Sequence, residues 1–369
     1  MRQTTIIISH PNPLTAMFKE IREATISIQA PKEEKVSKDL PVFYNPVMKT
    51  NRDISILLLR AIDNTDMQIC DPMAGTGIRA IRFLKELPKS KIKTIVINDS
   101  DPKATELITK NINENYHDLQ EQAGTEIIIT NTDANIMLLQ STGFDYIDID
   151  PFGTPNRFLD SAVKRLAREG ILAVTATDTS ALAGTFPKAC RRKYWAEPDR
   201  GPLKHEIGLR ILIRKCQLIA AQYDKALIPI YSYSKDHYMR VFFRCIKGKA
   251  HVDEIVKQHG THNDAGPLWL GTLWDVDLAA KMYNLIAKLD YDIDSKLIKT
   301  IRDESQIGSV GFHDIHYLCK QNKLEVIKFD KVYEALTKKK LPFSRTHFSD
   351  TGIRCDCSEK IIVNILKKG

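Results

Sequence analysis

The sequence predicts an α/β protein in which a doubly wound parallel sheet is followed by a smaller, basic α+β domain. From Met67 onward, short β-branched runs alternate with amphipathic segments, and a glycine-rich turn follows the first run. Strands that alternate with helices form a parallel sheet with helices on both faces. The length of 369 residues fits two domains, which we expect to span residues 1–248 and 249–369.

The elements of the first domain can be predicted in chain order. Residues 1–50 contain five prolines, which favours an extended or small β-rich lead-in. The expected strands are Met67–Cys70, Thr94–Asn98, Glu126–Thr130, Tyr146–Ile149 and Ile171–Thr175. The expected helices are Ile78–Leu87, Pro102–Asn115, Asn135–Leu139 and Arg157–Arg168. The strands are apolar almost throughout, as in sheets buried on both faces.

The second half of the chain begins with a long helix, expected over Glu206–Gln222. Two strands follow, Ala226–Tyr231 and Tyr238–Cys245, and the short spacer between them predicts an antiparallel hairpin at the end of the sheet. The stretch from Gly260 to Gly271 is rich in Gly, His and Pro and is typical of a linker. The remainder is expected to be mostly helical, with a basic, strand-like tail.

Composition and charge exclude several classes of protein. The sequence has no run of about 18 apolar residues and no segment resembling a signal peptide, so we expect no membrane span and a cytoplasmic location. Seven scattered cysteines favour a reducing compartment over a disulfide scaffold. The net charge of +8 favours an acidic partner such as nucleic acid. Residues 185–216 carry nine basic against three acidic side chains, although such a run is also typical of a solvated surface.

The first strand leads into the turn Asp71-Pro72-Met73-Ala74-Gly75-Thr76-Gly77. Ligands of open parallel sheets bind at the carboxyl ends of the strands, where glycines let the backbone approach them. A dinucleotide fingerprint would read G-x-G-x-x-G, whereas here Asp-Pro precedes the glycines and Ala80 replaces the third one. The turn resembles the first motif of class I S-adenosylmethionine (AdoMet)-dependent methyltransferases. NAD is the alternative cofactor, and a plain strand–turn–helix is the alternative structure.

Acidic residues also follow the next two strands. Asp99 stands where a carboxylate can accept hydrogen bonds from both ribose hydroxyls. Asp133 can accept a hydrogen bond from an adenine amino group, and the small Ala134 leaves room for the ring. A single aspartate after a strand is more often a helix cap. Two of them beside a glycine turn favour a nucleoside site.

The fourth strand leads into a rigid loop, Asp148-Ile149-Asp150-Pro151-Phe152-Gly153-Thr154-Pro155. It is similar to the [Asn/Asp]-Pro-Pro-[aromatic] loop of amino-methyltransferases. A carboxylate such as Asp150 can orient a conjugated amine and take its proton, and an aromatic ring such as Phe152 can stack on a flipped base. Alternatively, Asp150 caps the next helix and Phe152 belongs to the core.

Several motifs together resemble the tRNA (guanine-26-N2) dimethyltransferase family. They are Asp150–Pro155, Val42–Pro46 with Asn51–Asp53, Gly77–Arg79, His237–Arg240, Gly266–Gly271 and Ser344–Phe348. The resemblance implies a Rossmann-like class I methyltransferase domain that binds AdoMet through Arg52, Asp71, Gly75, Gly77, Arg79, Asp99, Asp133 and Ala134. It also implies that Asp150, Phe152 and Phe43 hold the flipped guanine. The guanidinium forks of Arg52 and Arg79 suit the methionine carboxylate.

The RNA surface can be predicted only in outline. Alternation along the strand after His237 suggests that His237, Tyr238 and Arg240 face RNA. The cluster Arg191–Lys193, with two aromatic neighbours, is typical of RNA-binding loops. The segment Ile307–Lys320 resembles a helix-turn-helix, although simple helix packing is the plainer interpretation.

The sequence therefore predicts an enzyme that transfers one or two methyl groups from AdoMet to the N2 amine of a guanine in tRNA, at position 26. The alternatives are an N6-adenine methyltransferase of RNA or DNA, an NAD-dependent oxidoreductase, and a non-catalytic RNA-binding protein. Some relatives carry a four-cysteine zinc cluster, but here Cys245, His251, His259 and His262 have irregular spacing. We expect no metal, and the sequence implies no protein partner.

Overall fold

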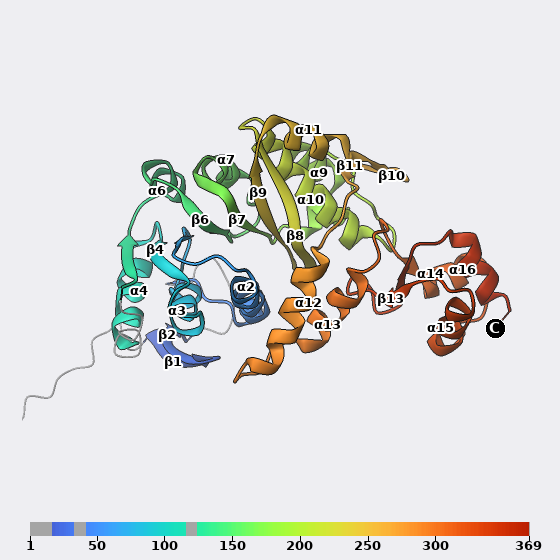
Figure 1. The fold of residues 1–369 in the computed structure, drawn as a ribbon, viewed down its shortest axis with the longest axis horizontal. Coiled ribbons are helices and arrows are strands. Elements are labelled where there is room, and N and C mark those ends of the chain that lie inside the picture. The colour runs from blue at the N-terminus through green and yellow to red at the C-terminus, as the bar shows by residue number, and fades with distance from the viewer. Residues whose placement is uncertain (1–16, 33–41, 116–123, 369) are drawn as a thin grey trace, which may run out of the picture.

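A computed structural model of the chain describes residues 17–32, 42–115 and 124–368. Its main body contains a seven-stranded sheet in the order β5-β4-β3-β6-β7-β9-β8 (Figure 1). Strands β3 to β7 are parallel, and β9 runs antiparallel to both β7 and β8. The bounds are Met67–Asp71 (β3), Ile92–Asn98 (β4), Glu126–Thr130 (β5), Phe144–Ile149 (β6), Leu166–Ala176 (β7), Lys225–Lys235 (β8) and Tyr238–Lys247 (β9). The predicted parallel sheet with a terminal hairpin is confirmed.

Strand β3 is the point at which the chain changes the side of the sheet to which it adds strands. The chain adds β4 and β5 on one side of β3 and then returns to place β6 and β7 on the other. Loops that leave β3 and β6 therefore diverge and open a crevice at their carboxyl ends. The predicted glycine turn follows β3 and the predicted catalytic loop follows β6, so both border this crevice.

Helices connect the strands and cover the sheet. Their bounds are Lys49–Ala61 (α2), Ile78–Glu86 (α3), Pro102–Glu114 (α4), Ala134–Gln140 (α6), Asn156–Arg165 (α7), Thr179–Leu182 (α8), Pro187–Tyr194 (α9), Lys204–Ala221 (α10) and Lys249–Lys257 (α11), with a 3-10 turn at Pro46–Met48. Local sequence explains where they begin. In α4, for example, Asp101 accepts a hydrogen bond from the Lys103 amide and Pro102 occupies the first turn.

The boundary between α7 and β7 lies earlier in the structure than predicted. The helix expected to reach residue 168 ends at Arg165, because Leu166 already pairs with Phe144 as the first residue of β7. Both side chains are buried, so the sheet gains apolar contact from starting the strand early. The lead-in forms a hairpin of β1 (Phe18–Glu23) and β2 (Ile26–Pro31), as expected for a β-rich segment. The rest of the predicted lead-in before residue 42 lies outside the described residues.

The stretch predicted as a linker is instead a hairpin. Strands β10 (His259–His262) and β11 (Ala265–Trp269) pair antiparallel, and β11 packs against α10. The side chains of Leu268 and Trp269 are buried there, which explains why the segment is ordered despite its glycines. Because α11 also packs on β8, residues 249–269 lie against the sheet. The domain boundary after residue 248 stays a prediction.

The C-terminal part comprises α12 (Val276–Leu285), a 3-10 turn (Ile286–Lys288), α13 (Ser295–Glu304), β12 (His313–Asp314), α14 (Ile315–Gln321), α15 (Phe329–Lys338), β13 (Phe343–Arg345), β14 (Gly352–Cys355) and α16 (Glu359–Leu366). Helices α12 and α13 pack on the main core, whereas buried residues from Ile315 to Leu366 form a separate hydrophobic core. The three strands form a sheet in the order β12-β14-β13, and Figure 1 shows β13 beside α14, α15 and α16 at one end of the molecule. The segment Ile307–Lys320 does not form the helix-turn-helix that its sequence resembles, because a short strand, β12, precedes the single helix α14.

A buried ion network joins this part to the sheet. Arg354 on β14 donates from Nη2 to Glu206 Oε2 on α10 at 2.7 Å, and from Nε to Glu304 Oε2 on α13 at 3.0 Å. The three side chains have no exposed area. Burial raises the pKa of Glu206, but Arg354 and Arg210 outweigh it and lower this pKa to about 2. The network therefore holds two parts of the chain together through charges that no water screens.

Candidate active site

A pocket of about 690 Å³ lies at the carboxyl ends of the parallel strands. All of the predicted site residues except Gly77 line it. They come from the turn before α2, from α2 and α3 themselves, the glycine turn after β3, the ends of β4 and β5, and the loop after β6. The pocket also includes His237 and Tyr238, from the hairpin between β8 and β9.

The two glycines of the turn have different roles. Gly75 has a φ of +55°, and a Cβ there would lie 2.7 Å from the carbonyl oxygen of Phe43. Only glycine therefore lets the Phe43 backbone approach the turn. Gly77 has a φ of +77° and begins α3, where a Cβ would crowd Ile108. Gly77 thus shapes the floor beneath the pocket without lining it.

The acidic residues after β4 and β5 both border the pocket. Asp99 Oδ2 accepts a hydrogen bond from the Gly75 amide at 2.9 Å, which fixes the glycine turn against the end of β4. Asp133 Oδ1 accepts hydrogen bonds from the amides of Asn135 and Ile136, so it caps α6. The cap uses one carboxylate oxygen. Asp133 can therefore cap α6 with this oxygen and bind a ligand with the other. Ala134 is the first residue of the capped helix.

Two buried polar atoms in the glycine turn lack a partner within the described residues. They are Asp71 Oδ2 and Thr76 Oγ1, and both residues line the pocket. Burial raises the pKa of Asp71 to about 7, although the nearby charge of Arg79 opposes it. Unsatisfied buried polar groups are costly unless a ligand completes them. A polar, positively charged ligand such as AdoMet fits this donor and acceptor set.

The guanidinium group of Arg52 is not free to bind a ligand bidentately in the pocket. Its Nε and Nη2 donate to the Glu23 carboxylate of β1 at 2.7 and 2.5 Å. Burial raises the pKa of Glu23, but Arg52 and Arg82 outweigh it and hold this pKa below its usual value. The bidentate contact expected with a methionine carboxylate is thus made with Glu23, which sequence reasoning did not single out. Arg52 Nη1 also donates to the Asn45 carbonyl at 3.4 Å, so all three nitrogens of this side chain already have partners within the chain.

Arg79 bridges two aspartates of β6 and its loop. Its Nη2 donates to Asp150 Oδ2, and its Nη1 lies 3.1 Å from Asp148 Oδ2. Asp148 also accepts two hydrogen bonds of 2.7 Å from Arg240 and one of 2.7 Å from Tyr146. Burial raises the pKa of Asp148, but Arg240 and Arg79 outweigh it and hold this pKa below its usual value. These contacts form a row of Arg240, Asp148, Arg79 and Asp150. Asp150 lies at the end nearest the pocket and therefore keeps a fixed orientation.

The prediction that Tyr238 and Arg240 face RNA is wrong. Tyr238 is 2% exposed and Arg240 is fully buried, because Arg240 neutralises Asp148 inside the sheet. His237, in the turn before β9, is exposed and remains at the pocket. A signal for the buried pair was present in the sequence. Asp148 and Arg240 each stand between two apolar neighbours in a strand, and a charge buried in this way requires a partner of opposite charge.

Aromatic rings close the mouth of the pocket. The ring centroids of Phe43 and Phe152 lie 4.1 Å apart at an interplanar angle of 68°, and Phe152 is 46% exposed. The loop that carries Phe152 is held by Gly153, whose amide donates to Thr177 Oγ1 at 2.6 Å. An exposed aromatic side chain on a rigid loop is suited to stacking on a planar ligand.

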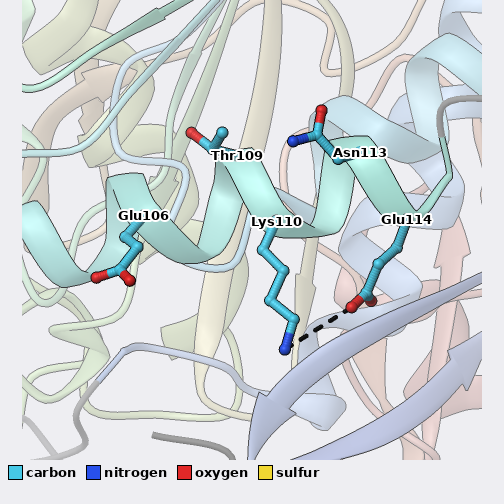
Figure 2. Close-up of a pocket in the computed structure, with 5 residues that line it drawn as sticks. All are labelled: Glu106, Thr109, Lys110, Asn113 and Glu114. Carbon is cyan, nitrogen blue, oxygen red and sulfur yellow. Dashed lines mark ion pairs between the residues drawn. The ribbon is translucent and has the colours of Figure 1, made fainter. Parts of the chain in front are cut away.

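A second surface hollow lies on one face of α4 (Figure 2). Five residues of that single helix line it: Glu106, Thr109, Lys110, Asn113 and Glu114. Lys110 Nζ lies 3.7 Å from Glu114 Oε1 in an exposed pair. None of the predicted site residues is among them, so the chemistry belongs to the larger pocket. Within the described residues no cluster of His, Cys, Asp or Glu could hold a metal ion. No helix of the described chain is long and apolar enough to cross a membrane.

The sheet order and this pocket define a class I AdoMet-dependent methyltransferase. The fold matches the solved structure of Trm1 from Pyrococcus horikoshii in complex with S-adenosyl-L-methionine, with a TM-score of 0.84 and 33% identity over 94% of this chain and 99% of that one. Within this class, the chain belongs to the N2,N2-dimethylguanosine tRNA methyltransferase family, whose model matches residues 23–264 and 259–367. The predicted fold, cofactor and family are therefore confirmed, and the NAD alternative is not supported.

Curated relatives agree with this assignment. The chain is 36% identical to the tRNA (guanine(26)-N(2)/guanine(27)-N(2))-dimethyltransferase of Aquifex aeolicus, over 92% of this chain and 93% of the relative. It is also 36% identical to the tRNA (guanine(26)-N(2))-dimethyltransferase of Pyrococcus abyssi, over 94% of this chain and 98% of the relative. Similarity thus extends over nearly the whole length of both proteins.

Proposed function

We propose that this chain methylates the exocyclic N2 amine of guanine 26 in tRNA, using AdoMet, and produces N2,N2-dimethylguanosine. Family membership supports the reaction class. The observation that carries the proposal is the position of Asp150, which lines the pocket at the end of β6 and is oriented there by Arg79. A carboxylate at this place can accept an N–H hydrogen bond from an amine that enters from outside the sheet.

The proposed chemistry needs one proton acceptor and good alignment. Bound AdoMet supplies an electrophilic methyl group. As the guanine N2 forms a bond to this methyl carbon and the carbon–sulfur bond breaks, Asp150 takes the N2 proton. Arg79 holds Asp150 in place, and the glycine turn with Asp71, Asp99 and Asp133 holds the donor. No covalent enzyme intermediate is needed, so alignment supplies much of the rate.

The aromatic pair supports a flipped base as substrate. The rings of Phe43 and Phe152 are in contact, so a guanine does not fit between them in this arrangement. We propose that it stacks on the outward side of Phe152, whose ring is already exposed. An unstacked base reaches such a pocket only after leaving its helix, which costs a few kcal/mol that binding elsewhere on the RNA must offset.

The location and the second domain are also proposals. All seven cysteines are free thiols in the structure, which supports a cytoplasmic enzyme. The basic C-terminal part, with eight basic against three acidic residues in its last 32, supports a role in gripping tRNA phosphates.

The test combines labelled AdoMet, an unmodified tRNA transcript and the purified chain, followed by mass spectrometry of the product nucleosides. N2-methylated guanosines are expected with wild type, and none with Asp150→Ala or with a transcript carrying adenine at position 26. Asp150→Ala should still bind AdoMet, which shows that the variant is folded. Label on adenine would refute the substrate and favour N6-adenine methylation. No transfer to any nucleic acid would refute the reaction.

A further inference from the structure

The outward side of α9 carries positive charge between two exposed aromatic rings. Phe186 immediately precedes this helix and is 60% exposed, and Trp195 immediately follows it and is 50% exposed. Positions three and four residues apart share one side of a helix, which places the exposed basic residues beside Trp195. We call the α9 face the set of Lys188, Arg191, Arg192 and Trp195 on this side, together with Phe186 at the start of the helix.

The opposite side of α9 is anchored beside the catalytic loop. Cys190 and Tyr194 are fully buried there. The hydroxyl oxygens of Tyr194 and Thr154 lie 3.1 Å apart, and Asn156 Nδ2 donates to the Lys193 carbonyl at 2.8 Å. Thr154 belongs to the loop that presents Asp150 and Phe152, and Asn156 directly follows that loop. The α9 face therefore keeps a fixed position relative to the reacting base.

The charges of this face are only partly balanced. Arg191 pairs with Glu197 at 2.5 Å, and Lys193 pairs with Asp178 at 3.0 Å. Lys188 and Arg192 have no ion pair among the described residues, although they stand four positions apart on one side of the helix. Like charges at this spacing disfavour the helix, and an anion bound across them removes the repulsion.

We propose that the α9 face binds the sugar–phosphate backbone of the tRNA strand next to the target guanine, with Phe186 stacking on a neighbouring base. The proposal rests on the function proposed above and names the surface that presents the RNA to that pocket. Lysine and arginine neutralise backbone phosphates, and exposed aromatic rings stack on unpaired bases. A helix of eight residues is about 12 Å long, which is enough to contact more than one phosphate.

The first test measures tRNA binding against salt for Lys188→Ala, Arg192→Ala and the double variant. Each phosphate contact contributes about 0.7–0.9 to the slope of log K against log salt concentration. We expect each single variant to lower the slope by about that amount and the double variant by about twice as much. The matched control is Lys93→Ala. Lys93 is exposed near the start of β4, at the end of the strands opposite the pocket, and its slope should equal that of wild type.

The second test separates stacking from charge. Phe186→Ala should weaken tRNA binding about ten-fold and leave the salt slope unchanged, because stacking releases no counterions. AdoMet affinity should stay at the wild-type value in every variant, which excludes misfolding. Wild-type slopes in both Lys188→Ala and Arg192→Ala would overturn the proposal and favour an acidic protein as the partner of this face. These assays measure tRNA binding, whereas the test of the proposed function measures methylation. Unchanged binding in the variants would overturn only the role of the α9 face, and absence of methylation in wild type would overturn only the proposed function.

Discussion

Replacing Arg354 with methionine should lower the Tm of the chain by about 4–6 °C. Methionine keeps much of the apolar volume but removes the cation that Glu206 and Glu304 share, and all three side chains are fully buried. Breaking a buried ion pair by removing one partner costs about 3–5 kcal/mol. At about 2.1 cal/mol/K per residue, a chain of 369 residues that unfolds as one unit has an unfolding entropy of about 0.8 kcal/mol/K. Dividing the lost free energy of unfolding by this entropy gives the expected decrease in Tm.

The assay is thermal unfolding followed by circular dichroism, with two comparisons. Arg302→Met removes a half-buried pair with Asp303 on the same helix as Glu304, and its Tm should change by less than about 1 °C. Adding Glu206→Gln and Glu304→Gln to Arg354→Met should recover part of the loss, since neutral amides need no cation. A shift below about 1 °C for Arg354→Met would refute the reasoning. A full loss that the added substitutions leave unchanged would assign the effect to packing and not to charge.

The pH dependence of stability provides a further check on the same network. The pKa of Glu206 falls from 4.5 to about 2 in the folded chain. A carboxylate with a lowered folded pKa stabilises the fold above its unfolded pKa and loses this effect as the pH falls toward the folded value. Wild-type stability should therefore decrease between about pH 4.5 and pH 2. In Arg354→Met the decrease should be smaller, because the pKa of Glu206 returns toward its usual value.

Two predictions concern the pocket. AdoMet affinity should rise between about pH 6 and pH 8, because the pKa of Asp71 is about 7 and a cationic ligand favours the ionised carboxylate. Calorimetry in buffers of different ionisation enthalpy should detect release of about half a proton at pH 7, and none in Asp71→Asn; equal proton release in both would contradict the assignment. Gly75→Ala should lower kcat/KM at least about ten-fold, since its Cβ would meet the Phe43 carbonyl at 2.7 Å. Gly308→Ala, with nothing within 4 Å, should change unfolding free energy by less than about 0.5 kcal/mol, and equal kcat/KM losses in both would contradict the steric argument.

Hydrophobic periodicity was sufficient to predict the sheet. Apolar strands such as β4 and the alternation with helices gave the parallel order, and the short spacer before Tyr238 gave the hairpin. The segment Gly260–Gly271 was misread because its glycines mask the burial of Leu268 and Trp269, which depends on contact with the distant α10. Tertiary contacts of this kind leave no local signal.

The location of the site could also be predicted from the sequence, whereas the ion pairs within it could not. Aspartates at strand ends identified the pocket, because the carboxyl ends of parallel strands meet at one edge. The sequence indicated that buried charges need partners of opposite charge, but it did not identify which residues pair. Glu23 lies 29 positions before Arg52, and Arg240 lies 92 positions after Asp148, so only the folded chain brings them together. Alternation alone placed Arg240 on the RNA side, whereas the charge of Asp148 requires it inside.

The row of Arg240, Asp148, Arg79 and Asp150 contains two cations and two anions. Its net charge is zero only while Asp150 is ionised. If Asp150 takes the N2 proton, the row is left with one uncompensated positive charge, most of it buried. Asp150 has the most exposed side chain of the four, at 16%, so it is the point of the row from which a transferred proton can reach solvent. Two successive methyl transfers to one amine would then release their protons by the same route.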